Sequence, residues 1–230
     1  MTFAAIVTAR KNSRRLPNKN VMDLGGKSLI SWTLEFALAQ HEISKIIVST
    51  DDHRVINVCR EFGIEVSKLR PESLSQDNTS TIDVCRYEIV SNSIQKRDFD
   101  GFFILQPTSP FRSVHTFKNV IQNFHTSERK SVVTIARKSI NPSWLITKDE
   151  GKKYLDAIDC REDTESKDYF IPNGNIYLAK FETLMRGNSL YDEGCVPVQP
   201  TRFYEDIDID YLSDLEMARS LLTSEGFILT

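Results

Sequence analysis

Cysteine is scarce in this chain of 230 residues, and its four copies lie far apart with no CxxC pair among them. That spacing excludes a zinc finger or a disulfide framework as the organising feature, and it predicts reduced, structural thiols. The four histidines stand in polar or helical contexts, where a solvated side chain is the common outcome. We therefore expect neither catalysis nor metal binding to depend on histidine.

Long apolar runs are also missing. No stretch approaches the length that crosses a bilayer, and the opening residues MTFAAIVTARKN lack the charge order, long apolar core and cleavage site of a signal peptide. The formal net charge of −3 argues against a general nucleic-acid-binding surface. Together these features predict a cytoplasmic protein that binds neither membranes nor nucleic acid.

The first polar loop contains neither a GxGxxG nor a GxxxxGK[ST] motif, so both common glycine-rich phosphate loops are excluded there. Positive charge is present instead, because five of the fourteen residues in VTARKNSRRLPNKN (residues 7–20) are Lys or Arg. Arg10 and Lys19 offer fixed charge, while Asn12, Ser13 and the backbone amides can donate hydrogen bonds to phosphate oxygens. The pattern predicts an anion site, and a solvated basic loop is the alternative.

Short apolar runs alternate with amphipathic segments along most of the chain, which is typical of an α/β, doubly wound, mostly parallel sheet. Residues 137–170 break this pattern and are interpreted as a small dimerisation insertion in a single domain spanning 1–230. We expect strands at 3–9, 45–49, 64–66, 101–105, 131–136, 175–179 and 195–198, and helices at 29–38, 55–62, 82–94, 114–124 and 211–223.

An acidic run, FYEDIDIDYLSD, precedes the last predicted helix. Isoleucines alternate with Asp206, Asp208 and Asp210, so a strand would place these three carboxylates on one side. Magnesium takes a few carboxylates together with substrate phosphate oxygens, and it would relieve their mutual repulsion. In the alternative interpretation, Asp208 or Asp210 caps the helix and the other acids are solvated.

Ligands of such sheets bind beyond the carboxyl ends of the strands, where the basic loop and the acidic run are both expected. A cationic loop and a carboxylate cluster in one crevice fit a metal–nucleoside-triphosphate. The polar loop RPESLSQDNTST (residues 70–81) can read a base edge, or it can simply cap the next helix through Asp77 or Thr79. Asn173-Gly174 predicts a turn, which could also place an amide on a polar ligand.

Six segments resemble, in order, those of the acylneuraminate cytidylyltransferases, the CMP-sialic acid synthetases. They are ARKNSRRLPNKN, IIVSTDD, LRPESLSQDNTST, LQPTSPFR, IPNGNIY and DIDIDYLSDLEMA, and the resemblance extends from residue 4 to about residue 222. It implies a homodimeric, Mg2+-dependent enzyme with a nucleotide-binding α/β sheet. The implied reaction joins CTP to the anomeric hydroxyl of a nonulosonic acid and releases pyrophosphate.

The resemblance also implies roles for individual residues. Arg10, Lys19, Asp208 and Asp210 are the implied catalytic residues, and the two aspartates are also the implied metal ligands. The implied CTP-binding set is Ala9, Arg10, Asn12, Ser13, Lys19, Asn20, Arg70, Thr79 and Thr81, and the implied sugar-binding set is Gln106, Asn173, Gly174 and Tyr177.

Two positions depart from the family pattern. Arg14-Arg15 replaces a common Lys-Gly, which changes the backbone freedom of the loop or adds a phosphate contact. Ile171 replaces an Arg found before Pro-Asn-Gly in many sialic-acid members, which leaves open the choice among neuraminate, legionaminate and pseudaminate types. The RRLP element resembles the CMP-3-deoxy-manno-octulosonate synthetases, which form the first alternative. A metal-dependent glycosyltransferase using a nucleotide-sugar and a non-catalytic nucleotide-binding regulator are the others.

Overall fold

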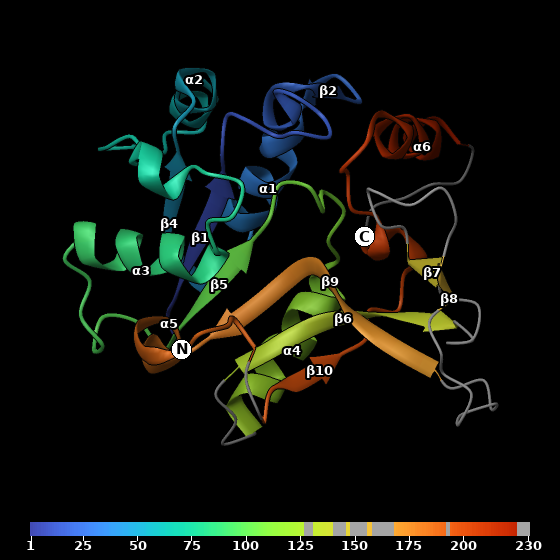
Figure 1. Ribbon diagram of the computed structural model, residues 1–230. Coiled ribbons are helices and arrows are strands. Elements are labelled where there is room, and N and C mark those ends of the chain that lie inside the picture. Colours follow the sequence, from blue (N-terminus) through green and yellow to red (C-terminus); the bar gives the residue numbers. More distant parts are fainter. Residues whose placement is uncertain (127–130, 140–145, 148–155, 158–167, 192–193, 225–230) are drawn as a thin grey trace.

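The computed structural model describes residues 1–126, 131–139, 146–147, 156–157, 168–191 and 194–224. Its centre is a six-stranded sheet in the order β10-β6-β9-β5-β1-β4, covered by helices on both faces (Figure 1). The sheet strands are β1 (Phe3–Ala9), β4 (Ile43–Thr50), β5 (Gly101–Leu105), β6 (Ser131–Ser139), β9 (Asp168–Ala179) and β10 (Val196–Val198). The helices are α1 (Leu29–Leu38), α2 (His53–Glu61), α3 (Thr81–Ser91), α4 (Val114–Thr126), α5 (Phe181–Arg186) and α6 (Leu212–Thr223).

Strand directions confirm the prediction of a mostly parallel sheet. β1 pairs in parallel with both β4 and β5, and β10 pairs in parallel with β6. Only β9 runs against its two neighbours, β5 and β6. Two short antiparallel pairs complete the described strands: β2 (Asp23–Leu24) with β3 (Lys27–Ser28), and β7 (Ile146–Thr147) with β8 (Asp156–Ala157).

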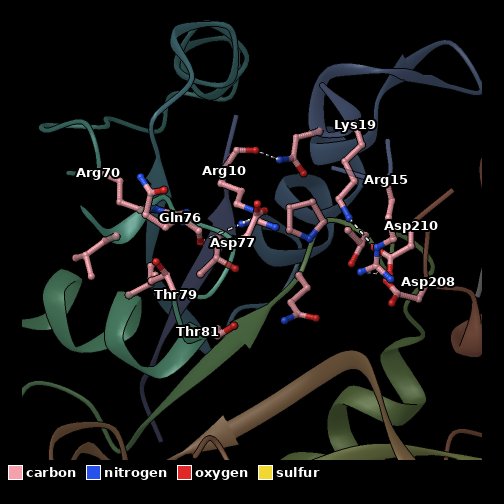
Figure 2. Close-up of a pocket in the computed structure, with 17 residues that line it drawn as sticks. Arg10, Arg15, Lys19, Arg70, Gln76, Asp77, Thr79, Thr81, Asp208 and Asp210 are labelled. Atoms are coloured by element: carbon pink, nitrogen blue, oxygen red, sulfur yellow. Dashed lines mark hydrogen bonds and ion pairs between the residues drawn. The ribbon is translucent and has the colours of Figure 1, made fainter. Parts of the chain in front are cut away.

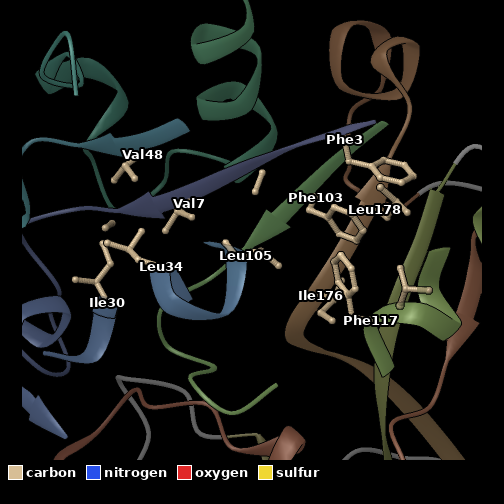
Figure 3. Close-up of a cluster of buried hydrophobic side chains, with 14 of the residues drawn as sticks. Phe3, Val7, Ile30, Leu34, Val48, Phe103, Leu105, Phe117, Ile176 and Leu178 are labelled. Carbon is tan, nitrogen blue, oxygen red and sulfur yellow. The ribbon is translucent and has the colours of Figure 1, made fainter. Parts of the chain in front are cut away.

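Each face of the sheet has its own apolar core, which explains the uninterrupted hydrophobic runs in the central strands. In β1, Phe3 and Val7 face a cluster shared with α1, α2 and α4, whereas Ala4 and Ile6 face a cluster shared with α3 and α5. Figure 3 shows the first cluster, in which Leu34 of α1 lies near the central strands. Burial on both faces makes the strand ends the places where polar side chains can meet solvent.

Three predicted elements are wrong. Residues 64–66 do not form a strand, because the Ile64 amide bonds to Cys59 O at the end of α2. Asn173-Gly174 does not close a turn but lies inside β9, where Gly174 has a φ of +78° beside a shift in the β6–β9 register. The acidic run is not a strand either: a 3-10 helix, η4 (Phe203–Asp206), leads into an irregular segment.

Some boundaries shift by a few residues, as in α3, which ends at Ser91 rather than at residue 94. The predicted insertion at 137–170 falls mostly outside the described residues, so its role as a dimerisation element stays a prediction. Within the described part of the chain, no helix is both long and apolar enough to cross a membrane.

Candidate active site

A polar cavity of about 350 Å3 opens at the carboxyl ends of β1, β4 and β5. Figure 2 shows Lys19, Arg15, Asp208 and Asp210 on one side of it, here called the Asp208 end. Arg70, Thr79 and Thr81 lie on the opposite side, here called the Arg70 end, with Arg10 and Asp77 between the two. The lining comprises Thr8, Arg10, Arg15, Lys19, Asn20, Arg70, Leu74, Gln76, Asp77, Thr79, Thr81, Val84, Gln106, Pro107, Thr108, Asp208 and Asp210.

At the Asp208 end, two cations hold one carboxylate. Lys19 Nζ lies 2.9 Å from Asp210 Oδ1, and Arg15 Nη2 lies 2.7 Å from Asp210 Oδ2. The Arg15 guanidinium also stands over the Tyr211 ring, 5.4 Å from its centroid. Hydrogen bonding to Tyr211 is the main cause of the raised pKa of Arg15, and Asp210 adds to it. Arg15 therefore extends the positive surface into the cavity.

Asp208 faces the open cavity from the same segment. Its pKa is raised because the surrounding protein displaces water from the carboxylate and because the Asp210 charge is near, while a hydrogen bond with Thr108 acts in the opposite direction. The Ile209 amide donates to Thr108 O at 2.7 Å, which fixes this segment against the loop after β5. Asp208 is thus a carboxylate for which a bound cation would relieve an electrostatic cost.

Packing rather than sheet pairing positions these aspartates. Ile207 and Ile209 are buried in a third apolar cluster, so the residues that alternate with them turn toward the cavity. The buried Glu205 anchors the segment, accepting hydrogen bonds from Ser113 and Thr116 at 3.0–3.1 Å. The predicted one-sided alternation therefore holds at Asp208 and Asp210 without a strand.

Neither Asp208 nor Asp210 caps α6, so the capping alternative is wrong. Tyr211 occupies the N-cap position of α6. The amides of Asp210 and Tyr211 both donate to the Asp214 carboxylate, at 2.9 and 2.8 Å.

The basic loop is held by its own polar side chains and by the end of β4. Asn20 Nδ2 donates to Arg10 O at 2.9 Å, and the buried Thr50 hydroxyl donates to Ala9 O at 2.6 Å. Asn20 lines the cavity, whereas Ala9, the exposed Asn12 and the buried Ser13 do not. For those three residues, contact with CTP stays a prediction, because none of them lines the cavity.

In the middle of the cavity, Arg10 already has a carboxylate partner. Arg10 Nη1 lies 2.9 Å from Asp77 Oδ1 and donates to Gln76 O at 3.0 Å. Arg14 forms an ion pair with the other oxygen of Asp77. The sequence predicted for Asp77 only a role in capping the next helix. That prediction is wrong, because Ser80 caps α3 by accepting a hydrogen bond from the Asp83 amide. An incoming anion must therefore compete with Asp77 for Arg10.

The Arg70 end combines a buried fork of donors with apolar walls. Arg70 is 6% exposed, and burial lowers its pKa while the charges of Asp51 and Glu88 oppose that effect. Thr79 and Thr81 also line this end, together with the apolar Leu74 and Val84. A flat, partly apolar ring with polar edges suits such a surface.

The implied sugar-binding residues separate into two groups. Gln106 lines the cavity, and Gly174 packs behind it: a Cβ at Gly174 would stand 2.9 Å from Gln106 Oε1. Asn173 is buried away from the cavity lining, where its amide donates to Asp206 and accepts from Thr134. Tyr177 is buried in β9, and burial is the main cause that raises its pKa to about 12.

Nine of the predicted site residues thus share one cavity, and six do not line it. The nine are Arg10, Lys19, Asn20, Arg70, Thr79, Thr81, Gln106, Asp208 and Asp210. Sequence reasoning did not assign Thr8, Leu74, Gln76, Asp77, Val84, Pro107 or Thr108 to the site. A signal was available for five of them, since Leu74, Gln76 and Asp77 stand in the polar loop already suspected of ligand contact, and Pro107 and Thr108 stand in the LQPTSPFR segment.

Comparisons with known proteins support the same interpretation. A family model described as "Cytidylyltransferase" matches residues 4–224. CMP-N,N'-diacetyllegionaminic acid synthase of Legionella pneumophila is 33% identical over 96% of this chain and 97% of its own length. N-acylneuraminate cytidylyltransferase of Escherichia coli O18:K1:H7 is 28% identical over 93% of this chain. The chain spans only half of that longer relative.

A solved structure of CMP-2-keto-3-deoxy-manno-octonic acid synthetase in complex with CTP has the same fold. It superposes with a TM-score of 0.69 at 20% identity and covers 96% of this chain and 98% of its own. The resemblance to the acylneuraminate cytidylyltransferases is confirmed by the matched family model and by the relatives. This chain belongs to the cytidylyltransferase family.

Proposed function

We propose that this protein transfers CMP from CTP to the anomeric hydroxyl of a nonulosonic acid and releases pyrophosphate. One observation carries the proposal: a single cavity holds cations beside two aspartates at one end and a buried Arg with apolar walls at the other. The first end suits a triphosphate and the second suits a base. In the reaction the anomeric oxygen attacks the α-phosphorus, the bond to the β-phosphate oxygen breaks, and the hydroxyl loses its proton.

The cations of the cavity bind and orient the triphosphate. Arg10, Arg15 and Lys19 offset the negative charge that grows on pyrophosphate as it leaves. When the nucleotide binds, Arg10 leaves Asp77 and contacts a phosphate oxygen. Lys19 likewise leaves Asp210 for a phosphate oxygen. Preformed ion pairs hold these long side chains in place before the nucleotide arrives, which lowers the entropic cost of binding.

Asp208 and Asp210 fit a magnesium ion that is shared with the nucleotide. The described residues contain no cluster of three His, Cys, Asp or Glu that could hold a metal alone, which agrees with an ion that arrives on phosphate oxygens. The repulsion and desolvation at Asp208 favour a cation there. When bound, Mg2+ neutralises phosphate charge and lowers the pKa of a coordinated hydroxyl. In our scheme Asp208, whose pKa is raised, accepts the proton of the anomeric hydroxyl.

The sugar is expected at the Gln106 side of the cavity, beside Asp208. A diacetamido nonulosonate of the legionaminate type is the first candidate, because the relative with 33% identity bears that name. The 3-deoxy-manno-octulosonate alternative is not favoured, since its synthetase is similar at only 20% identity and therefore shows the fold alone. A glycosyltransferase or a regulator has no observation in its favour among the described residues.

We also propose that the protein is a homodimer located in the cytoplasm. Tyr169, Phe170 and Ile171 expose 38–49% of their surfaces in succession at the start of β9. Three consecutive exposed apolar residues suit burial against a second copy. Sedimentation of the purified protein measures the dimer directly, and a monomer at micromolar concentration would contradict it.

Pyrophosphate release with CTP and Mg2+ tests the function. The panel should contain N-acetylneuraminate, a legionaminate, a pseudaminate and 3-deoxy-manno-octulosonate. We expect release with one nonulosonate, no release without sugar, and loss of activity when EDTA removes the metal. Folded, CTP-binding protein that releases no pyrophosphate with any sugar would refute the proposal.

A further inference from the structure

One carboxylate joins the two polar loops that meet at the middle of the cavity. Asp77 Oδ1 lies 2.9 Å from Arg10 Nη1, and the other oxygen of Asp77 forms an ion pair with Arg14. Figure 2 shows Arg10 and Asp77 between the Arg70 end and the Asp208 end. A triphosphate that extends from one end to the other therefore reaches Arg10 where the Asp77 carboxylate already contacts it.

The two arginines stand in different surroundings. Arg10 lines the cavity and its side chain is 33% exposed, whereas Arg14 does not line the cavity and is 80% exposed. Each arginine contacts one oxygen of the Asp77 carboxylate, although a guanidinium can bind both oxygens in a parallel fork. Arg14 can therefore hold Asp77 by itself, outside the cavity.

The loop that carries Asp77 has few polar contacts with the rest of the protein. Among the described residues, the side chains and backbone of 71–79 reach other segments by hydrogen bonds or ion pairs only through Gln76 O and Asp77, which both pair with the basic loop. Other hydrogen bonds of the loop are internal, such as that from Gln76 Nε2 to Glu72 O at 3.0 Å. An outward shift of Asp77 therefore breaks few contacts besides the one with Arg10.

We propose that Asp77 is a built-in competitor of phosphate for Arg10, and that Arg14 binds its carboxylate when a nucleotide displaces it. This inference rests on the proposed function. Before the nucleotide binds, Asp77 neutralises Arg10 and holds its guanidinium in the cavity. In the complex, Arg10 contacts phosphate and both oxygens of Asp77 turn to Arg14. The displaced carboxylate keeps a cation in this way, which lowers the cost of the exchange.

The same competition acts on the product that leaves. Pyrophosphate lacks the base and the sugar of CTP, so the cations of the cavity supply most of its binding. Asp77 competes with it for Arg10, since one guanidinium cannot satisfy two anions as fully as one. The return of the Asp77 carboxylate to Arg10 therefore favours pyrophosphate release.

Calorimetric titration of the full chain with CTP, and separately with pyrophosphate, tests this competition without any sugar. We expect Asp77→Asn to lower both dissociation constants roughly fivefold, the upper range for a partly exposed ion pair. Asp83→Asn is the matched control, because Asp83 also forms an ion pair, with Arg86 at 2.7 Å, and neither residue lines the cavity. The control should leave both constants within about twofold of wild type.

Arg14→Gln distinguishes a partner for the displaced Asp77 from a direct contact with phosphate. By itself this variant should raise both dissociation constants about threefold, because the displaced carboxylate has no second cation. In the Asp77→Asn background it should leave both constants unchanged, because no carboxylate remains for Arg14 to bind. A double-mutant cycle over the two positions measures this coupling.

Folded Asp77→Asn that binds both ligands no more tightly than wild type would overturn the inference. An equal loss of affinity from Arg14→Gln in both backgrounds would overturn the role of Arg14, since it would mark a direct attraction for phosphate. Wild-type protein that binds pyrophosphate but no CTP refutes the proposed function. The effect of Asp77→Asn on pyrophosphate binding then decides separately whether Asp77 competes for Arg10.

Discussion

Lys19 and Asp210 are 191 residues apart in the chain, yet the Lys19 ammonium lies 2.9 Å from Asp210 Oδ1. The contact joins the first loop to the segment before the last helix. An apolar cluster makes it possible, because Leu16 and Leu24 from the N-terminal part pack with Ile209 and Leu215. α6 lies beside β2 in Figure 1, and the two are in contact. The Asp208 end is therefore assembled by long-range packing.

Lys19→Ala is expected to lower the rate of pyrophosphate release by at least tenfold, on the order of 1.4 kcal/mol in the barrier. The Lys19 side chain is only 14% exposed, so the lost charge is weakly screened. Arg15→Ala should cost less, because the Arg15 side chain is 54% exposed. Lys118→Ala, on the exposed face of α4, is the control and should retain normal turnover. Turnover of Lys19→Ala within twofold of wild type would remove Lys19 from the mechanism.

Asp208→Asn is expected to abolish turnover and at the same time to raise the melting temperature at pH 7. The pKa of Asp208 is higher in the folded protein than its ordinary value, so folding favours the protonated form. Its ionisation therefore costs stability, and that cost appears as pH rises through the window between the ordinary and the raised pKa. The gain in the variant should vanish below this window. Calorimetric melting from pH 3 to pH 8 measures it, and a lower melting temperature at pH 7 would contradict the assignment.

Gly174→Ala tests the contact behind Gln106. Gly174 has a φ of +78°, and an added Cβ would stand 2.9 Å from Gln106 Oε1 and 3.0 Å from Ser109 Oγ. We expect a loss of roughly 2–3 kcal/mol in the free energy of unfolding, from backbone strain together with displacement of Gln106. Gly26→Ala is the matched control, because its φ is +87° and its Cβ would meet nothing within 4 Å.

Both variants carry the backbone strain of a positive φ, so the difference between their losses in unfolding free energy measures the contact of the added Cβ with Gln106. Urea unfolding measures both, and the KM for the sugar should rise only in Gly174→Ala. Equal losses in the two variants would show that the close approach to Gln106 has no energetic consequence.

The sequence predicted the sheet from local patterns, whereas the nine shared cavity residues were assigned as a set through the family resemblance. Apolar runs such as 3–9 and 101–105 are buried on both faces, and polar loops leave their carboxyl ends. The wrong predictions concern residues whose positions depend on contacts between distant parts of the sequence. Asp77 reaches Arg10 through a loop conformation that no local periodicity encodes. Asn173-Gly174 resembles a turn locally, and only pairing with β6 and β5 keeps it inside β9.

Arg112→Lys is expected to lower the free energy of unfolding by about 2 kcal/mol. Arg112 is 2% exposed and donates to three elements: Asn175 O at 2.9 Å, Thr33 Oγ1 at 2.9 Å and Gln106 O at 2.6 Å. Burial lowers its pKa to about 9, and no carboxylate of the described residues lies within ion-pair distance of it. The guanidinium therefore serves as a three-way hydrogen-bond donor, and the charge of Glu205 opposes the effect of burial on its pKa without a direct ion pair.

A lysine ammonium cannot span those three acceptors from one position, so at least one buried oxygen stays unpaired. Release of the Gln106 carbonyl should also raise the KM for the sugar while leaving the affinity for CTP within twofold. Urea unfolding and steady-state kinetics measure the two effects, with Arg60→Lys on the exposed surface of α2 as the control. If Arg112→Lys unfolds at the wild-type urea concentration, the buried fork is not needed to hold the loop after β5 against α1 and β9.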